Sequence, residues 1–108
     1  MSLPFYRLAL ESKLGFRPYP GTLNLELPRE YMWVRTFIRE RGERVEGQGE
    51  LGGLSLCRGR LGQIPVGLLI PDKTAHRNVV EVVAESNLRR ALELSDGGEV
   101  WVEISSER

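Results

Sequence analysis

The sequence predicts a mainly β fold, a small six-stranded barrel with two short helices. Short segments of alternating apolar and polar residues recur from residue 22 to the end of the chain, and glycines or polar turns separate them. Apolar residues at helical spacing are confined to the regions near residues 4–14 and 87–93. Because 108 residues have room for one core, we expect a single domain over residues 1–108.

The N-terminal part is predicted to form a helix, a turn and a strand. Apolar residues at helical spacing over residues 3–14 predict a short amphipathic helix, and Gly15 is typical of a left-handed C-terminal cap. The PYPG sequence of residues 18–21 predicts a turn. Residues 22–27, TLNLEL, then alternate strictly, which predicts a strand with one apolar face.

Residues 28–42 fit neither period, so the sequence assigns them no structure. Beyond them, a short helix is predicted over residues 87–94, with Ser86 as its N-cap. The Gly52-Gly53 pair predicts a bulge or a close approach of two backbones. The remaining predicted strands cover residues 43–49, 51–57, 63–70, 79–84 and 100–104.

Composition argues against several classes of function. The 15 basic and 15 acidic side chains balance, which disfavours binding to nucleic acid through bulk electrostatics. A single cysteine, Cys57, and a single histidine argue against a zinc site, and one thiol fits a reducing cytosol. No apolar run is long enough to span a membrane, and no signal-peptide pattern opens the chain. We therefore expect a cytoplasmic protein that binds neither membranes nor nucleic acid.

Thr22 and Asn24 are the first candidates for chemistry. They are two residues apart, so their oxygens would share one face of the predicted strand. Neutral oxygen ligands suit Mg²⁺ when phosphates bring most of the negative charge. Gly21, just before them, lets a ligand approach the backbone closely. Taken alone, the pattern still favours the simpler alternative, a strand with a polar, solvated face.

Glu81 is the second candidate, because it interrupts the valine-rich strand of residues 79–84. Either this strand lies at an edge of the sheet and Glu81 is exposed to solvent, or the carboxylate of Glu81 is held among apolar neighbours. In the second case Glu81 could bind a hydroxyl group or accept its proton. The sequence leaves the two alternatives open. Residues 86–89 open the last predicted helix, where backbone amides could hold a phosphate, although an ordinary N-cap is commoner.

Together, KLGFRPYPGTLNLEL at residues 13–27 and IPDKTAHRNVVEVVAESNLRRALELSDGGEV at residues 70–100 resemble the archaeal CTP-dependent riboflavin kinases. The resemblance covers the chain almost from Ser2 to Val102. Its specific part is the order GTLN, PxxT, VVEVVA and xNLR. It implies a cradle-loop β-barrel that transfers the γ-phosphoryl group of CTP to the 5′-hydroxyl of riboflavin with Mg²⁺, giving FMN and CDP.

The resemblance also implies a role for particular residues. Thr22 and Asn24 would bind Mg²⁺. Thr74 and Glu81 would contact riboflavin or FMN. We further predict that Glu81 is the catalytic residue, which orients the 5′-hydroxyl and takes its proton. Contacts to the nucleotide, CTP or CDP, would come from Ser86, Asn87, Leu88 and Arg89.

One departure from the family concerns a glycine-rich GxGEG-like segment that holds the nucleotide phosphates. In family members it follows a first strand and precedes the stretch matching Ser2 to Pro4, where this sequence does not contain it. A barrel that lacked its first strand would expose an edge of the sheet, so we expect either a monomer or pairing with another copy through that edge. Two functions stay open, the kinase and a non-catalytic flavin- or nucleotide-binding module that has lost the phosphate loop. A DNA-binding relative is disfavoured by the zero net charge.

Overall fold

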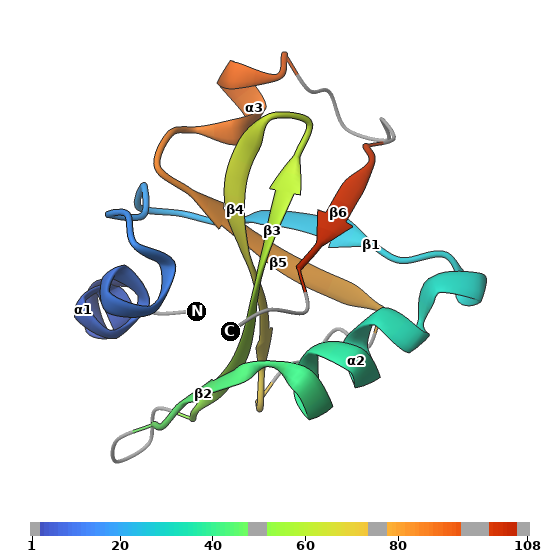
Figure 1. Cartoon of the computed structure of the whole chain (residues 1–108), viewed down its shortest axis with the longest axis horizontal. Coiled ribbons are helices and arrows are strands. Elements are labelled where there is room, and N and C mark those ends of the chain that lie inside the picture. The colour runs from blue at the N-terminus through green and yellow to red at the C-terminus, as the bar shows by residue number, and fades with distance from the viewer. Residues whose placement is uncertain (1–2, 48–51, 74–77, 94–99, 106–108) are drawn as a thin grey trace.

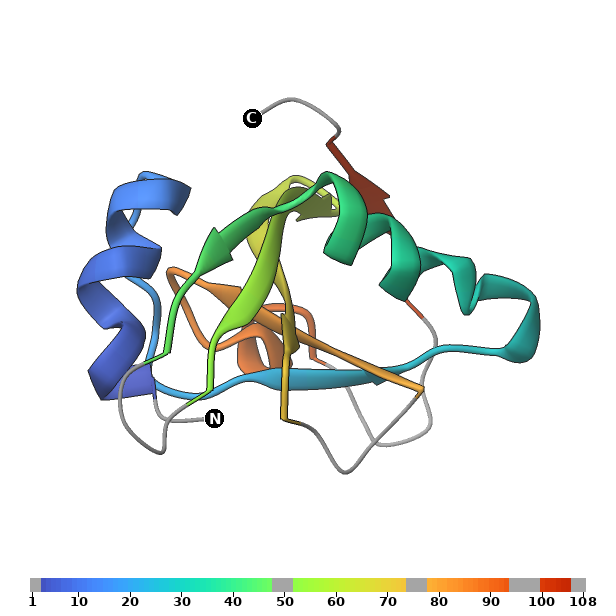
Figure 2. The same ribbon diagram turned by 90° about the horizontal axis from the view of Figure 1, so that it is seen from below.

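A curled antiparallel sheet of six strands, a half-barrel, forms the frame of the protein (Figure 1). The computed structural model describes residues 3–47, 52–73, 78–93 and 100–105. The prediction of a mainly β fold with short helices is confirmed. Figure 2 shows α1 at one end of the sheet and α2 at the other, with the strands between them.

The elements follow one another as short strands with helices at the start, the middle and near the end. None of the helices in the described part of the chain is long and apolar enough to cross a membrane. In chain order the elements are α1 (Leu3–Leu14), β1 (Leu23–Glu26), the 3₁₀ turn η1 (Arg29–Tyr31), α2 (Trp33–Arg41), β2 (Glu43–Val45), β3 (Leu54–Leu61), β4 (Ile64–Pro71), β5 (Val79–Ala84), α3 (Leu88–Ala91) and β6 (Val102–Ile104).

The strands pair in the order β1-β5-β4-β3-β2, and β6 also pairs with β3. β3 pairs with β4 over its whole length. Its other side is divided, since β2 pairs with residues 54–56 and β6 with residues 59–61. β5 therefore lies inside the sheet, between β1 and β4.

Most predicted elements are present, with three corrections. Residues 28–42, left without an assignment, contain η1 and α2, so the chain has more than the two predicted helices. The helix predicted over residues 87–94 is shorter, Leu88–Ala91. Its N-cap is Asn87 and not Ser86, because the Asn87 side chain accepts a hydrogen bond from the backbone N–H of Arg90. The longer polar side chain of Asn87 reaches that amide from the position immediately before the helix.

Two apolar clusters cover the two faces of the sheet, and strand alternation separates them. Neighbouring residues of β4 show the division, because Leu68 belongs to the inner cluster and Leu69 to the outer one. α2 contributes Ile38 to the inner cluster, whereas α1 packs on the outer face through Leu10 and Leu14. Cys57 is buried in the inner cluster, as expected of a small apolar side chain.

Close backbone contacts fix the junctions on either side of β2. A Cβ atom at Gly42, between α2 and β2, would collide with the carbonyl oxygens of Ile38 and Leu56. At Gly53, before β3, it would lie 2.7 Å from the carbonyl oxygen of Val45. The close approach predicted at the Gly52-Gly53 pair is therefore confirmed at Gly53.

Candidate functional site

Three polar side chains meet on the outer face of the sheet, two from the strands β1 and β5 and one, Thr22, from the residue just before β1. Asn24 of β1 lies directly opposite Glu81 of β5. The Thr22 hydroxyl oxygen lies 3.2 Å from Glu81 Oε1 and 3.3 Å from Asn24 Oδ1. Thr22 and Asn24 share one strand face, as the alternating pattern predicts, and the tertiary structure adds Glu81 to them.

Backbone hydrogen bonds beyond both ends of the β1–β5 pairing hold these side chains in place. The N–H of Tyr19 donates to the carbonyl of Ala84, and the N–H of Leu27 donates to the carbonyl of Asn78, both at 2.7 Å. Between them Gly21 adopts a φ of 121°, a conformation that side-chain-bearing residues rarely take. The PYPG turn thus delivers Thr22 to the start of β1 beside Glu81.

Glu81 lies on an interior strand, so the edge-strand alternative for this residue is wrong. Its side chain is half-buried. Leu69 lies opposite it on β4, and Val83 follows two residues later on the same face. Both are buried in the outer cluster. The carboxylate therefore has apolar neighbours on one side and the polar groups of Thr22 and Asn24 on the other.

The hydroxyl of Thr22 and the amide oxygen of Asn24 fit a hard divalent cation such as Mg²⁺, and the carboxylate of Glu81 lies beside Thr22 with one negative charge. Two neutral oxygen ligands leave positions for water or phosphate oxygens. The 3.3 Å between Thr22 Oγ1 and Asn24 Oδ1 is close to the spacing of about 3 Å that adjacent ligands adopt in an octahedral Mg²⁺ site. Within the described residues, no group of three or more His, Cys, Asp or Glu side chains offers a competing site.

The segment of residues 86–89 lies at the start of α3, close to the PYPG turn. The Asn87 side chain is engaged at both ends, because its Oδ1 accepts from Arg90 N at 3.2 Å and its Nδ2 donates to the Tyr19 hydroxyl at 3.4 Å. Leu88 is buried in the inner cluster. Ser86 and Arg89 are exposed. A ligand at this segment would therefore meet the side chains of Ser86 and Arg89 and the backbone of Asn87 and Leu88.

Tyr19, predicted from the sequence only as part of a turn, also belongs to this region. The residue is 43% exposed, and its hydroxyl contacts the segment of residues 86–89 through Asn87. A clue was present in the sequence, since an aromatic residue between two prolines has little freedom to move. Its partner is 68 residues away in the chain, so the contact itself could not be foreseen.

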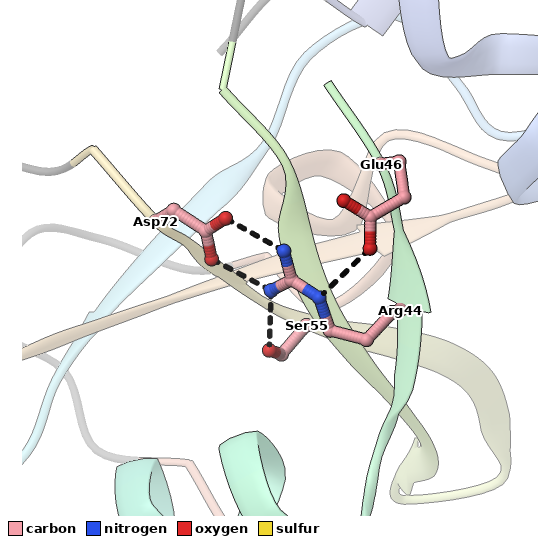
Figure 3. A network of polar contacts seen from close by, with 4 residues as sticks. All are labelled: Arg44, Glu46, Ser55 and Asp72. Carbon is pink, nitrogen blue, oxygen red and sulfur yellow. Dashed lines mark hydrogen bonds and ion pairs between the residues drawn. The ribbon is translucent and has the colours of Figure 1, made fainter.

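Thr74 lies outside the described residues. Asp72, directly after the end of β4, is held by several polar contacts. Figure 3 shows the Arg44 guanidinium donating two hydrogen bonds of 2.7 Å to the carboxylate of Asp72. Arg44 also donates to Ser55 Oγ at 3.2 Å and forms an ion pair with Glu46 at 3.5 Å. The N–H of Asp72 donates to the carbonyl of Gly53. These contacts fix the end of β4 to β2 and β3.

The Arg44–Asp72 pair predicts a pH-dependent contribution to stability. Hydrogen bonds from Arg44 hold the pKa of Asp72 below its ordinary value. Because the pKa of Asp72 is lower in the folded state, its ionised carboxylate stabilises the fold at pH values above the unfolded-state pKa of about 4. This stabilisation is lost as the pH falls through the lower pKa of the folded state. Asp72→Asn should cost up to about 1 kcal/mol at pH 7, because both side chains are partly exposed.

Urea unfolding of wild type and Asp72→Asn at pH 7 and pH 3 measures this contribution. The difference in unfolding free energy should shrink at pH 3, because the unfolded chain takes up a proton on Asp72 below about pH 4. Glu46→Gln is the matched control, since this side chain is 80% exposed and pairs with the same arginine. A difference between wild type and Asp72→Asn that stays constant with pH would contradict the prediction.

Comparison with known proteins gives consistent matches over nearly the whole chain. The family model CTP-dep_RFKase, with the description "Domain of unknown function DUF120", matches residues 1–104. The riboflavin kinase of Methanopyrus kandleri is 38% identical over 105 residues, which cover 96% of this chain and 71% of that protein.

Other similar proteins are longer. The riboflavin kinase of Pyrobaculum islandicum is 39% identical over 110 residues, covering 96% of this chain and 52% of its own length. That of Archaeoglobus fulgidus is 38% identical over 110 residues, covering 96% of this chain and 47% of its own length. The chain thus spans about half the length of these two curated relatives.

Proposed function

Because this chain belongs to the CTP-dependent riboflavin kinase family, we propose that it transfers the γ-phosphoryl group of CTP to the 5′-hydroxyl of riboflavin, giving FMN and CDP with Mg²⁺ as cofactor. One observation carries the proposal. Thr22, Asn24 and Glu81 converge on one face where β1 pairs with β5. Phosphoryl transfer asks a protein mainly for positioning and charge neutralisation, and this arrangement can supply both.

Thr22 and Asn24 would hold the magnesium ion, which neutralises phosphate charge when it is bound. Glu81 would accept a hydrogen bond from the 5′-hydroxyl of riboflavin and thereby direct the oxygen toward the phosphoryl group. It would take the proton of this hydroxyl late in the reaction, because phosphoryl transfer needs little help from a base. The apolar side chains of Leu69 and Val83 limit the water around this carboxylate.

Residues on either side of the site would bind the two substrates. Thr74 would contact riboflavin or FMN, and the Arg44–Asp72 pair fixes the strand end that precedes it. CTP or CDP would lie against Ser86, Asn87, Leu88 and Arg89. In this segment the Asn87 side chain holds the backbone in place by its contacts with Arg90 and Tyr19.

Flavin titration and a kinase assay test the proposal on this chain. Riboflavin and FMN should bind, which flavin fluorescence reports directly, and CTP with Mg²⁺ should convert riboflavin to FMN. Flavin binding without FMN formation at saturating CTP would instead support the non-catalytic binding module. No binding at high micromolar flavin would reject both.

A further inference from the structure

The hydroxyl of Thr22 faces two acceptors but has one hydrogen to donate. Its oxygen lies 3.2 Å from Glu81 Oε1 and 3.3 Å from Asn24 Oδ1. A threonine hydroxyl carries one O–H and two lone pairs, and an amide carbonyl oxygen carries lone pairs only. Thr22 can therefore make a full-strength hydrogen bond to one of the two oxygens at a time.

A bound cation would settle which acceptor is used. If Thr22 Oγ1 and Asn24 Oδ1 both present lone pairs to the ion, Asn24 Oδ1 is no longer oriented to accept the Thr22 hydrogen. Glu81 Oε1 is then the acceptor that remains. The hydrogen would point toward β5 and the lone pairs of Thr22 toward the metal.

We propose that Glu81 is a positioning residue for the metal, which it orients through the hydroxyl of Thr22. This inference rests on the proposed function, since it takes Thr22 and Asn24 as the metal ligands. It adds to the contact of Glu81 with riboflavin, because a carboxylate has a second oxygen for the substrate hydroxyl. One side chain would thus serve both the metal and the flavin.

The position of Glu81 suits this role. β5 is held on both sides, by β1 and by β4, so the Cα of Glu81 is fixed relative to Thr22. The buried side chains of Leu69 and Val83 beside it restrict where the carboxylate can turn. Partners that orient metal ligands are typically worth 10- to 100-fold in metal affinity. We expect a loss of about that size when the acceptor is removed.

A double-mutant cycle with Mn²⁺ as the probe tests the inference without any activity assay. Mn²⁺ broadens NMR signals of nearby backbone amides, so titrating the chain in the presence of saturating CDP, which supplies phosphate oxygens, and following residues 22–25 gives both the location and the affinity of the ion. In the wild-type background, Glu81→Ala should weaken Mn²⁺ binding about 10- to 100-fold. In a Thr22→Val background the same change should have a clearly smaller effect, since no hydroxyl remains to be oriented.

Two further variants separate the hydrogen bond from simple charge. Glu81→Gln keeps an oxygen that can accept from Thr22, so it should retain more affinity than Glu81→Ala. Glu26→Gln is the charge control, because Glu26 lies two residues from Asn24 on the same strand face and is exposed. Through its charge alone it should weaken binding about two- to threefold.

The outcomes distinguish this inference from the proposed function. If wild type shows no Mn²⁺ broadening near residues 22–25, the metal assignment in the proposed function is wrong. If wild type binds but Glu81→Ala has the same effect with and without the Thr22 hydroxyl, the positioning role is wrong and the metal site stands. Equal affinities of Glu81→Gln and Glu81→Ala would also overturn it. Unchanged amide spectra without metal exclude unfolding as the cause.

Discussion

Glu81→Gln lowers the turnover of riboflavin phosphorylation roughly a hundred- to ten-thousandfold, the range of general-base effects, while FMN still binds. Glutamine has nearly the same shape, so it fits the same position beside the buried Leu69 and Val83. Its amide oxygen can still accept a hydrogen bond from Thr22 or from a substrate hydroxyl, but it cannot take a proton. The variant therefore removes the proton acceptor and leaves the surrounding site in place.

Two measurements on Glu81→Gln check this result. The rate of FMN formation at saturating riboflavin and CTP gives turnover, and flavin fluorescence gives the affinity for FMN. Glu26→Gln is again the matched control, with the same substitution on the same face of the sheet and little expected change in turnover. Unchanged turnover in Glu81→Gln would limit Glu81 to a binding role, whereas loss of FMN binding would point to a damaged pocket.

Ile38→Ala lowers the free energy of unfolding by about 2–5 kcal/mol, the usual cost of truncating a large core side chain. Ile38 is 0% exposed and packs in the inner cluster between α2 and the sheet. Total stabilities of single domains are about 5–15 kcal/mol, so this single change removes a large part of what holds the fold. Stability is lost because the strands around Ile38 are too rigid to collapse into the cavity that the truncated side chain leaves.

Urea unfolding followed by tryptophan fluorescence measures this loss, since Trp33 lies at the start of α2. Thr36→Ala is the control on the same helix, because Thr36 is exposed and its truncation should change stability by less than about 0.5 kcal/mol. Similar stabilities for the two variants would mean that α2 does not depend on Ile38 for its attachment to the sheet.

Local patterns in the sequence determined much of this structure. Strict alternation over residues 22–27 and the β-branched residues 79–84 were enough to predict β1 and β5 and to place Thr22 and Asn24 on one face. Gly15 ends α1 with a φ of 82°, as its position after the apolar pattern predicted. These features depend on neighbours within a few residues, whose side-chain directions follow from the period of the element itself.

α2 could not be predicted in this way because its pattern is disturbed. Arg35 is 8% exposed, whereas Trp33 is 57% exposed, so a charged residue lies inside and an aromatic residue outside. The cap of α3 was likewise misassigned, because Ser86 and Asn87 are both good N-cap residues. The structure uses Asn87 as the cap, and the same side chain also makes a tertiary contact with Tyr19.

Only the tertiary structure decided which of these side chains meet. The sequence places Thr22 and Glu81 59 residues apart, and Arg44 and Asp72 28 residues apart, with nothing local to link them. Strand pairing brings them together, and it is selected by how the whole sheet buries its apolar residues on two faces at once. That pairing makes β5 an interior strand. It thereby decides between the two alternatives for Glu81, which is a half-buried neighbour of Thr22. Burial of both faces is a property of all the strands together, which no single segment of the sequence contains.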